Sequence, residues 1–136
     1  MAEITLKAED ESLDAMNMFL EEQFDEMGLG MKLVMKLMVV MEELFVNVAH
    51  YAYPDGKGDC KIEMNLDGDV LTIRITDSGM PFDPVAKSDP DIKAKAEDRS
   101  IGGLGIYIVK QTMTTMEYER KDGQNILTMT KNIKEV

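Results

Sequence analysis

Residues 61–76 read KIEMNLDGDVLTIRIT, and this stretch decides the fold. Its two halves, 61–66 and 70–76, alternate apolar and polar side chains, as strands with one buried face do. The Asp67-Gly68-Asp69 triplet between them favours a tight turn, because glycine readily adopts the positive φ that such turns require. The stretch therefore predicts a β-hairpin that packs one face against a core.

Further strands are predicted on both sides of this hairpin. Residues 4–7 alternate and predict a short first strand. Residues 116–120 and 125–131 predict a second hairpin, joined through Lys121-Asp-Gly-Gln124.

Three segments have the apolar spacing of helices. They are residues 10–27, capped by Asp10 or Ser12; residues 31 to about 53; and residues 102–116. The order β-α-α-β-β-loop-α-β-β predicts an α/β two-layer sandwich, with a mixed, largely antiparallel sheet and the helices on one face. The length of 136 residues fits one domain, 1–136. Residues 78–100 hold three of the four prolines and predict a long functional loop.

The composition restricts the class of partner. The net charge of −11 disfavours nucleic acid and anionic membranes, and any bound nucleotide would need local N–H donors or a cation. A single cysteine, Cys60, excludes an internal disulfide and fits a reducing compartment. No secretory signal is visible, and the longest apolar run, residues 37–41, is too short to span a bilayer. We expect a cytoplasmic protein.

The second predicted helix has a polar face beside its core stripe. Glu43 and Asn47 are four residues apart and share that face, whereas Glu42 lies about 100° away around the helix. A carboxylate and an amide together could provide a base and a neutral Mg²⁺ ligand. His50 lies near the same face, where a structural hydrogen bond is its commonest role. An isolated pair of this kind is more often simply a solvated face.

Two glycine-containing turns follow. Asp77-Ser-Gly79 comes directly after a strand, so Asp77 could accept a hydrogen bond from an exocyclic amine while Gly79 permits close approach. Residues 99–105, RSIGGLG, open the third helix, where successive N–H groups and the helix dipole favour phosphate. No GK[ST] follows and no parallel βαβ unit surrounds this cluster, so it is neither a P-loop nor a Rossmann fingerprint.

Taken in order, these stretches resemble the N, G1 and G2 boxes of the GHKL ATPase superfamily. Within this superfamily, the local sequence is similar to that of the small anti-sigma factor serine kinases of the SpoIIAB and RsbW type. The matching stretches are EELFVNVAHYAY (42–53), DSGMPFDP (77–84), DRSIGGLGI (98–106) and GQNILTMTK (123–131). Asn125 departs from the threonine that the family often has in its Gly-x-x-Thr pattern.

The resemblance implies a Bergerat-type sandwich that binds ATP and Mg²⁺ under a lid at about 78–100. It implies that Asn47 ligates Mg²⁺, that Asp77 bonds the adenine amino group beside Gly79, and that Glu43 is the general base. Residues implied to contact the phosphates are Gly102, Gly103, Gly105 and, as a cation or a lid residue, Arg99.

Three functions remain open from the sequence. The first is a protein-serine kinase acting as an anti-sigma or partner-switching regulator, with a sigma factor and a STAS-type antagonist as partners and a homodimer possible. The second is an ATP- or ADP-binding module without phosphoryl transfer, for which an acidic, methionine-rich surface is suitable. The third, the ATPase domain of a larger machine or a histidine kinase, would need an upstream phosphoacceptor helix pair or a transducer domain, which the sequence does not show.

Overall fold

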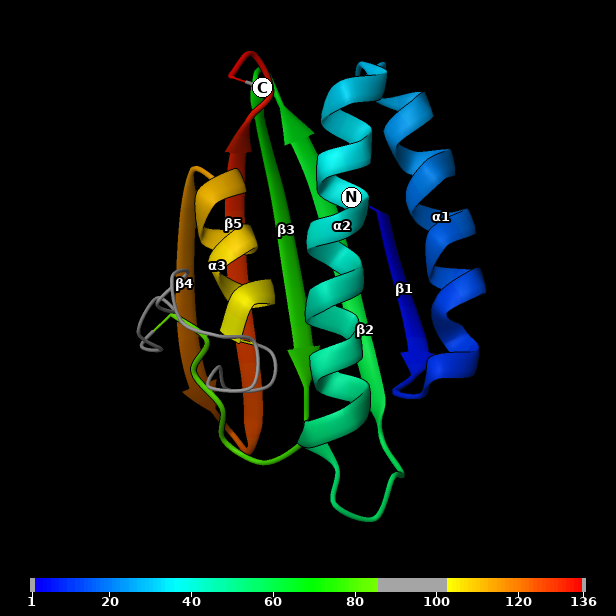
Figure 1. Cartoon of the computed structure of the whole chain (residues 1–136), viewed down its shortest axis with the longest axis vertical. Helices are drawn as coiled ribbons and strands as arrows, with labels where there is room; N and C mark the ends of the chain where they lie inside the picture. The colour runs from blue at the N-terminus through cyan, green and yellow to red at the C-terminus, as the bar shows by residue number, and fades with distance from the viewer. Residues whose placement is uncertain (1, 86–102, 136) are drawn as a thin grey trace.

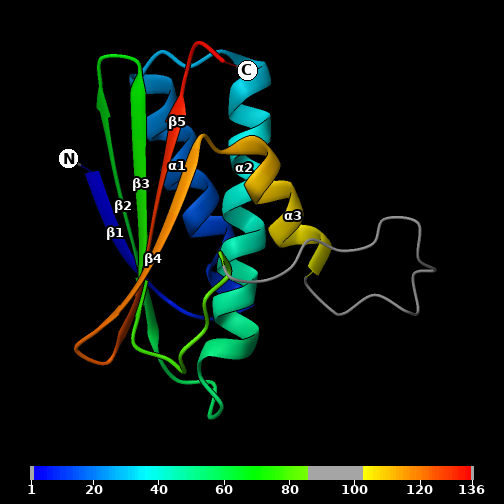
Figure 2. The same ribbon diagram turned by 90° about the vertical axis from the view of Figure 1, so that its left-hand side faces the viewer.

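A five-stranded sheet and three helices make up two layers in the computed structural model, which describes residues 2–85 and 103–135. The sheet has the order β1-β2-β3-β5-β4, and each neighbouring pair is antiparallel. The helices all cover one face (Figures 1 and 2). The two-layer α/β sandwich is therefore confirmed, with a fully antiparallel rather than mixed arrangement of the described strands. The elements are β1 (Ala2–Lys7), α1 (Leu13–Glu26), α2 (Met31–Asn47), β2 (Asp59–Asp67), β3 (Val70–Asp77), α3 (Gly103–Thr112), β4 (Thr115–Lys121) and β5 (Gln124–Asn132).

Both predicted hairpins form with tight two-residue turns. Gly68 has φ +60° between β2 and β3. Asp122 and Gly123 have φ 52° and 77° between β4 and β5, the left-handed pair that matches the twist of two antiparallel strands. Each turn sets the register of its own two strands, which places Glu63 opposite Arg74 in the first hairpin and Glu117 opposite Thr128 in the second.

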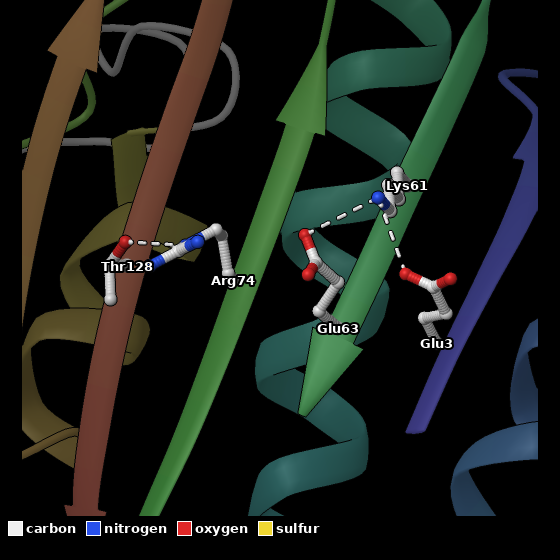
Figure 3. Close-up of polar contacts among 5 residues, drawn as sticks. All are labelled: Glu3, Lys61, Glu63, Arg74 and Thr128. Carbon is white, nitrogen blue, oxygen red and sulfur yellow. Dashed lines mark hydrogen bonds and ion pairs between the residues drawn. The ribbon is translucent and has the colours of Figure 1, made fainter. Parts of the chain in front are cut away.

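The inner face of the sheet carries the core. Alternate side chains of the three central strands are buried under the helices: Cys60, Ile62, Met64, Leu71, Ile73, Ile75, Leu127 and Met129. The outer face is polar: Lys61 Nζ lies 3.2 Å from Glu3 Oε2 and 3.9 Å from Glu63 Oε1. Figure 3 shows these three side chains on the sheet. Ion pairs as exposed as these contribute little to stability. Burial on the inner face, rather than these ion pairs, therefore holds the fold together.

Helix α2 lies across the middle of the sheet, between α1 and α3 (Figure 1). Its buried stripe is Leu33, Leu37, Val40, Met41, Leu44 and Phe45. The helix continues into a wider π turn, η2 (Val48–Ala52), so the predicted helical segment does extend to about residue 53. Such π turns are rare overall, and those that occur are often found at functional sites. Among the described residues, no helix is long and apolar enough to cross a bilayer.

Two predicted helix ends are wrong. A 3₁₀ turn, η1 (Asp10–Ser12), precedes α1, and neither Asp10 nor Ser12 caps that helix with its side chain. Asp10 Oδ1 instead lies 2.7 Å from His50 Nε2, because the end of α2 comes close to the start of α1. Helix α3 ends at Thr112 rather than at Met116, since Thr115 already pairs with Thr130 in the sheet.

Candidate functional site

A cavity of about 400 Å³ lies between the C-terminal end of α2, the end of β3 and the loop after β3. Its walls are mostly apolar and include Leu44, Ile75, Phe82 and Leu127. Polar groups enter this lining at a few points, from Asn47, Asp77, Tyr118 and Asn125. An apolar pocket with a few convergent polar groups is the usual form of a small-molecule site.

Asp77 is the last residue of β3 and is only 7% exposed. Its Oδ1 accepts the Gly79 N–H at 2.9 Å and the Asn125 Nδ2–H at 2.9 Å. The described part of the chain gives the other carboxylate oxygen, Oδ2, no hydrogen-bond partner. A carboxylate oxygen without a partner beside an apolar cavity is suited to accept a hydrogen bond from a ligand.

Gly79 lies against the π turn at the end of α2. A Cβ at this position would overlap with the carbonyl oxygen of Ala52. The next residue donates its N–H to the same oxygen, with Met80 N 2.8 Å from Ala52 O. The close approach that Gly79 permits thus joins the loop after β3 to the end of α2, at the border of the cavity.

Asn47 ends α2 and lines the cavity. No hydrogen bond to its carboxamide is present within residues 2–85 and 103–135. A free amide oxygen is a ligand that Mg²⁺ accepts, and Mg²⁺ commonly takes only one or two protein ligands beside phosphates and water. The described residues contain no cluster of three or more His, Cys, Asp or Glu that could hold a metal by itself. The donor set therefore fits a phosphate-bound Mg²⁺.

Glu43 lies one turn before Asn47 and is half-buried, whereas Glu42 is exposed. A Cβ at Gly105 would overlap with Glu43 Oε2. The carboxylate of Glu43 therefore rests against the first turn of α3, which begins at Gly103. The structure brings Glu43 of the first motif and Gly105 of the third together, and Glu43 is not part of the cavity lining.

Some predicted positions are not among those that line the cavity or contact Glu43 in the described structure. Arg99 and Gly102, with the part of the expected lid from 86 to 100, lie outside the described residues. His50 does not line the cavity; its ring is paired with Asp10 on the surface.

Several residues that sequence reasoning did not select hold the site together. Asn125 is 6% exposed and binds Asp77, and its departure from the family threonine was the only signal for it. The Tyr53 hydroxyl donates to Asp59 O at 2.6 Å and accepts the Ser78 N–H at 2.8 Å. Burial raises the pKa of Tyr53, although the Ser78 N–H opposes that rise.

Cys60, which pairs with Asp77 across β2 and β3, is fully buried. Burial, with a smaller contribution from the charge of Asp77, raises the pKa of its thiol to about 12. A thiol held neutral in this way packs as a small apolar group and is a poor nucleophile.

Comparison with known proteins agrees with this geometry. The model of the histidine kinase-like ATPase domain matches residues 6–131. The serine-protein kinase RsbW of Bacillus cereus is 28% identical over 113 residues, 80% of this chain and 70% of that protein. The serine/threonine-protein kinase BtrW of Bordetella bronchiseptica is 25% identical over 95 residues, 69% of this chain and 67% of that protein.

A solved structure has the same fold. The crystal structure of the RsbU and RsbW domains of a Mycobacterium tuberculosis protein superposes with a TM-score of 0.61 at 13% identity. The match covers 97% of this chain, which spans only 32% of that longer one. With the family model matching nearly the whole length, the chain belongs to the histidine kinase-like ATPase domain family and resembles its RsbW-type members.

Proposed function

We propose that the chain is a Mg²⁺-ATP-dependent protein-serine/threonine kinase that acts as an anti-sigma or partner-switching regulator. One observation carries the proposal: a single apolar cavity receives the unpaired groups of Asp77 and Asn47, and Glu43 adjoins it beside α3. Relatives named as serine-protein kinases support phosphoryl transfer as the reaction. In this proposal residues 1–136 form one ATP-binding domain, and residues 78–100 form its lid.

The base and the phosphates would bind at opposite ends of the site. The free oxygen of Asp77 would accept a hydrogen bond from the exocyclic amino group of adenine. Leu44, Ile75 and Leu127 would supply the apolar surroundings that a purine prefers. The N–H groups of the first helical turn have no partner within a helix. In α3 these include the groups of Gly103 and Gly105, which would bind phosphate oxygens together with Gly102 and Arg99.

The Asn47 carboxamide would hold Mg²⁺. When bound, this ion neutralises charge on the phosphates, which is the main electrostatic requirement of phosphoryl transfer. Glu43 would orient a serine or threonine hydroxyl of the partner and accept its proton as the oxygen bonds to the γ-phosphorus and ADP leaves. The contact between Glu43 and α3 would keep this carboxylate near the phosphate-binding turn.

The partners that we propose are a STAS-type antagonist, as the phosphorylated protein, and a sigma factor, as the sequestered one. The acidic chain, with a net charge of −11, fits protein partners better than nucleic acid. A homodimer is compatible with this role.

The adjacent glutamates allow a matched test. We would incubate the chain with Mg²⁺, ATP and candidate STAS proteins, and measure phosphoserine and phosphothreonine on the STAS protein. Glu43→Gln should lower the transfer rate about 10²- to 10⁴-fold, as loss of a general base does. The exposed Glu42→Gln should transfer at the wild-type rate. Equal rates for both variants, or no transfer to any STAS protein, would contradict the kinase proposal.

An ATP-binding module without transfer is the second candidate, and one surface favours it. Met31, Met35 and Val39 are 80%, 64% and 46% exposed and lie four residues apart along α2. Such an apolar stripe can bind a partner without any chemistry. Partner capture that depends on ATP but is unchanged in Glu43→Gln, with no phosphate transferred, would support this candidate.

A further inference from the structure

Asn125 is a buried residue at the centre of a part-buried hydrogen-bond network beside Asp77, at the border of the cavity. Its Nδ2 donates to Asp77 Oδ1 at 2.9 Å and to Met80 O at 2.7 Å. Its Oδ1 accepts from Tyr118 Oη at 2.6 Å and from Arg120 Nη1 at 3.2 Å. The side chain thus uses both its donors and its acceptor, which is the condition for a buried polar network to be rigid.

The orientation of this amide is determined by its surroundings. The Phe82 N–H is a third donor that faces Oδ1, at 3.3 Å. Turning the amide over would place its oxygen against the oxygens of Asp77 and Met80, and its NH₂ group against the N–H donors of Arg120 and Phe82. Only one orientation of the Asn125 amide satisfies these groups, so its N–H is always directed at Asp77.

This N–H decides which oxygen of Asp77 a ligand can use. With the Gly79 N–H also bound, Oδ1 already has two donors, both at 2.9 Å. The carboxylate therefore cannot rotate freely, and Oδ2 alone is available to the cavity. A threonine hydroxyl, one bond shorter than the Asn125 amide, could not span the same distance to Asp77 and also reach Met80.

We propose that Asn125 is the positioning residue that fixes the Asp77 carboxylate for the amino group of a 6-aminopurine, and so determines nucleobase selectivity in this chain. The inference rests on the proposed ATP site. It adds that selectivity depends on a residue of β5, which lies 48 positions from the carboxylate that reads the base.

The same network also attaches the base-reading carboxylate to the loop after β3. Arg120 Nη1 donates to Gly79 O at 2.7 Å, and Asn125 holds the carbonyl of Met80. Two side chains of the β4–β5 hairpin thus donate hydrogen bonds to two consecutive carbonyl groups of that loop. A change at Asn125 would loosen the carboxylate and this turn together.

The test compares two ligands that differ only in the amino group: ATP and purine riboside triphosphate, which lacks it. Isothermal titration gives the ratio of their affinities for the wild-type chain and for Asn125→Asp, which is isosteric but replaces the N–H donor by an oxygen. In the wild type the ratio should be about 10- to 100-fold, the value of a hydrogen bond to a charged acceptor. In Asn125→Asp it should fall about 10-fold, as coupling between residues in contact allows.

Asn125→Ser is the second variant, since its small side chain fits the site if Asn125→Asp does not fold. Thr128→Val is the matched control: Thr128 is on the same strand but on the open face, where its Oγ1 accepts from Arg74 Nε at 3.4 Å (Figure 3). The control should keep the wild-type ratio.

The ratio separates positioning from mere support of the fold. If Asn125 only supports the fold, both ligands weaken equally and the ratio stays at the wild-type value, which would overturn the inference. A wild-type chain that binds ATP while both variants retain its selectivity contradicts this inference alone. A wild-type chain that binds neither ligand contradicts the proposed function itself, and the inference with it.

Discussion

Gly79→Ala tests how tightly the loop after β3 is packed against the end of α2. The added Cβ would lie 2.5 Å from the Cβ of Ala52, whereas ordinary contact begins at 3.4 Å. It would also overlap with the carbonyl oxygen of Ala52, which is backbone and cannot rotate away. The two segments would have to separate by roughly 1 Å, as overpacked sites do.

That separation has two costs. Overpacking of this kind costs about 1–3 kcal/mol. It would also break the bond from Met80 N to Ala52 O, now 2.8 Å long, and a typical hydrogen bond contributes about 0.5–1.5 kcal/mol. We therefore expect the free energy of unfolding to fall by about 2–4 kcal/mol, a large share of the 5–15 kcal/mol typical of a domain.

Guanidinium unfolding followed by circular dichroism measures this change from the midpoint at constant slope. Gly30→Ala is the matched control, because a Cβ there meets nothing within 4 Å and φ is −69°. It should alter stability by no more than about 0.5 kcal/mol. A Gly79→Ala chain that unfolds at the same midpoint as Gly30→Ala would refute the packing argument.

Three further changes have different expected results. The three atoms nearest to a Cβ at Gly105 all belong to the flexible side chain of Glu43, so Gly105→Ala should leave the unfolding midpoint nearly constant. Phosphate transfer should fall about 10²-fold because the carboxylate is displaced, and an unchanged transfer rate would contradict a role for this contact. Tyr53→Phe leaves Ser78 N–H and Asp59 O without their partner and should cost about 1–3 kcal/mol, measured by thermal melting. Cys60, whose pKa rises from 9.0 to about 12, should resist thiol reagents at pH 8 until the chain unfolds. Between pH 9 and about pH 12 the folded chain keeps the thiol proton that the unfolded chain loses. The free energy of unfolding should therefore fall as the pH rises through this range, by up to about 1.4 kcal/mol per pH unit. In Cys60→Ala it should depend less on pH over the same range.

The local elements could be predicted because their signals lie close together in the sequence. The alternation in residues 61–76 and the Asp122-Gly123 pair are sufficient for two hairpins, since each turn sets the register of its own strands. The face shared by Glu43 and Asn47 follows from helix geometry alone. The start of α1 and the end of α3 could not be predicted, because Asp10 pairs with His50, 40 residues away, and Thr115 is taken by β4.

Of the candidate site, the sequence indicates the residues of the three motifs but not the residues that hold them in place. Asp77 and Gly79 lie in a recognisable turn, but the partner that holds Asp77 is Asn125, on a strand that follows it 48 residues later in the chain. An asparagine in an alternating strand has no pattern that indicates five hydrogen bonds. Such residues become identifiable only when the tertiary neighbours of each polar group are known.

The strand order has a consequence for how the protein is made. Because β3 is paired with β5 rather than with β4, the central strand lacks one neighbour until nearly all of the domain has been synthesised. Asp77 and Asn125 meet only after that pairing, and contacts of such long sequence separation form late and slowly. A nascent chain that has completed α2 and β3 would therefore have no finished pocket, and ATP could not serve as a template for its early folding.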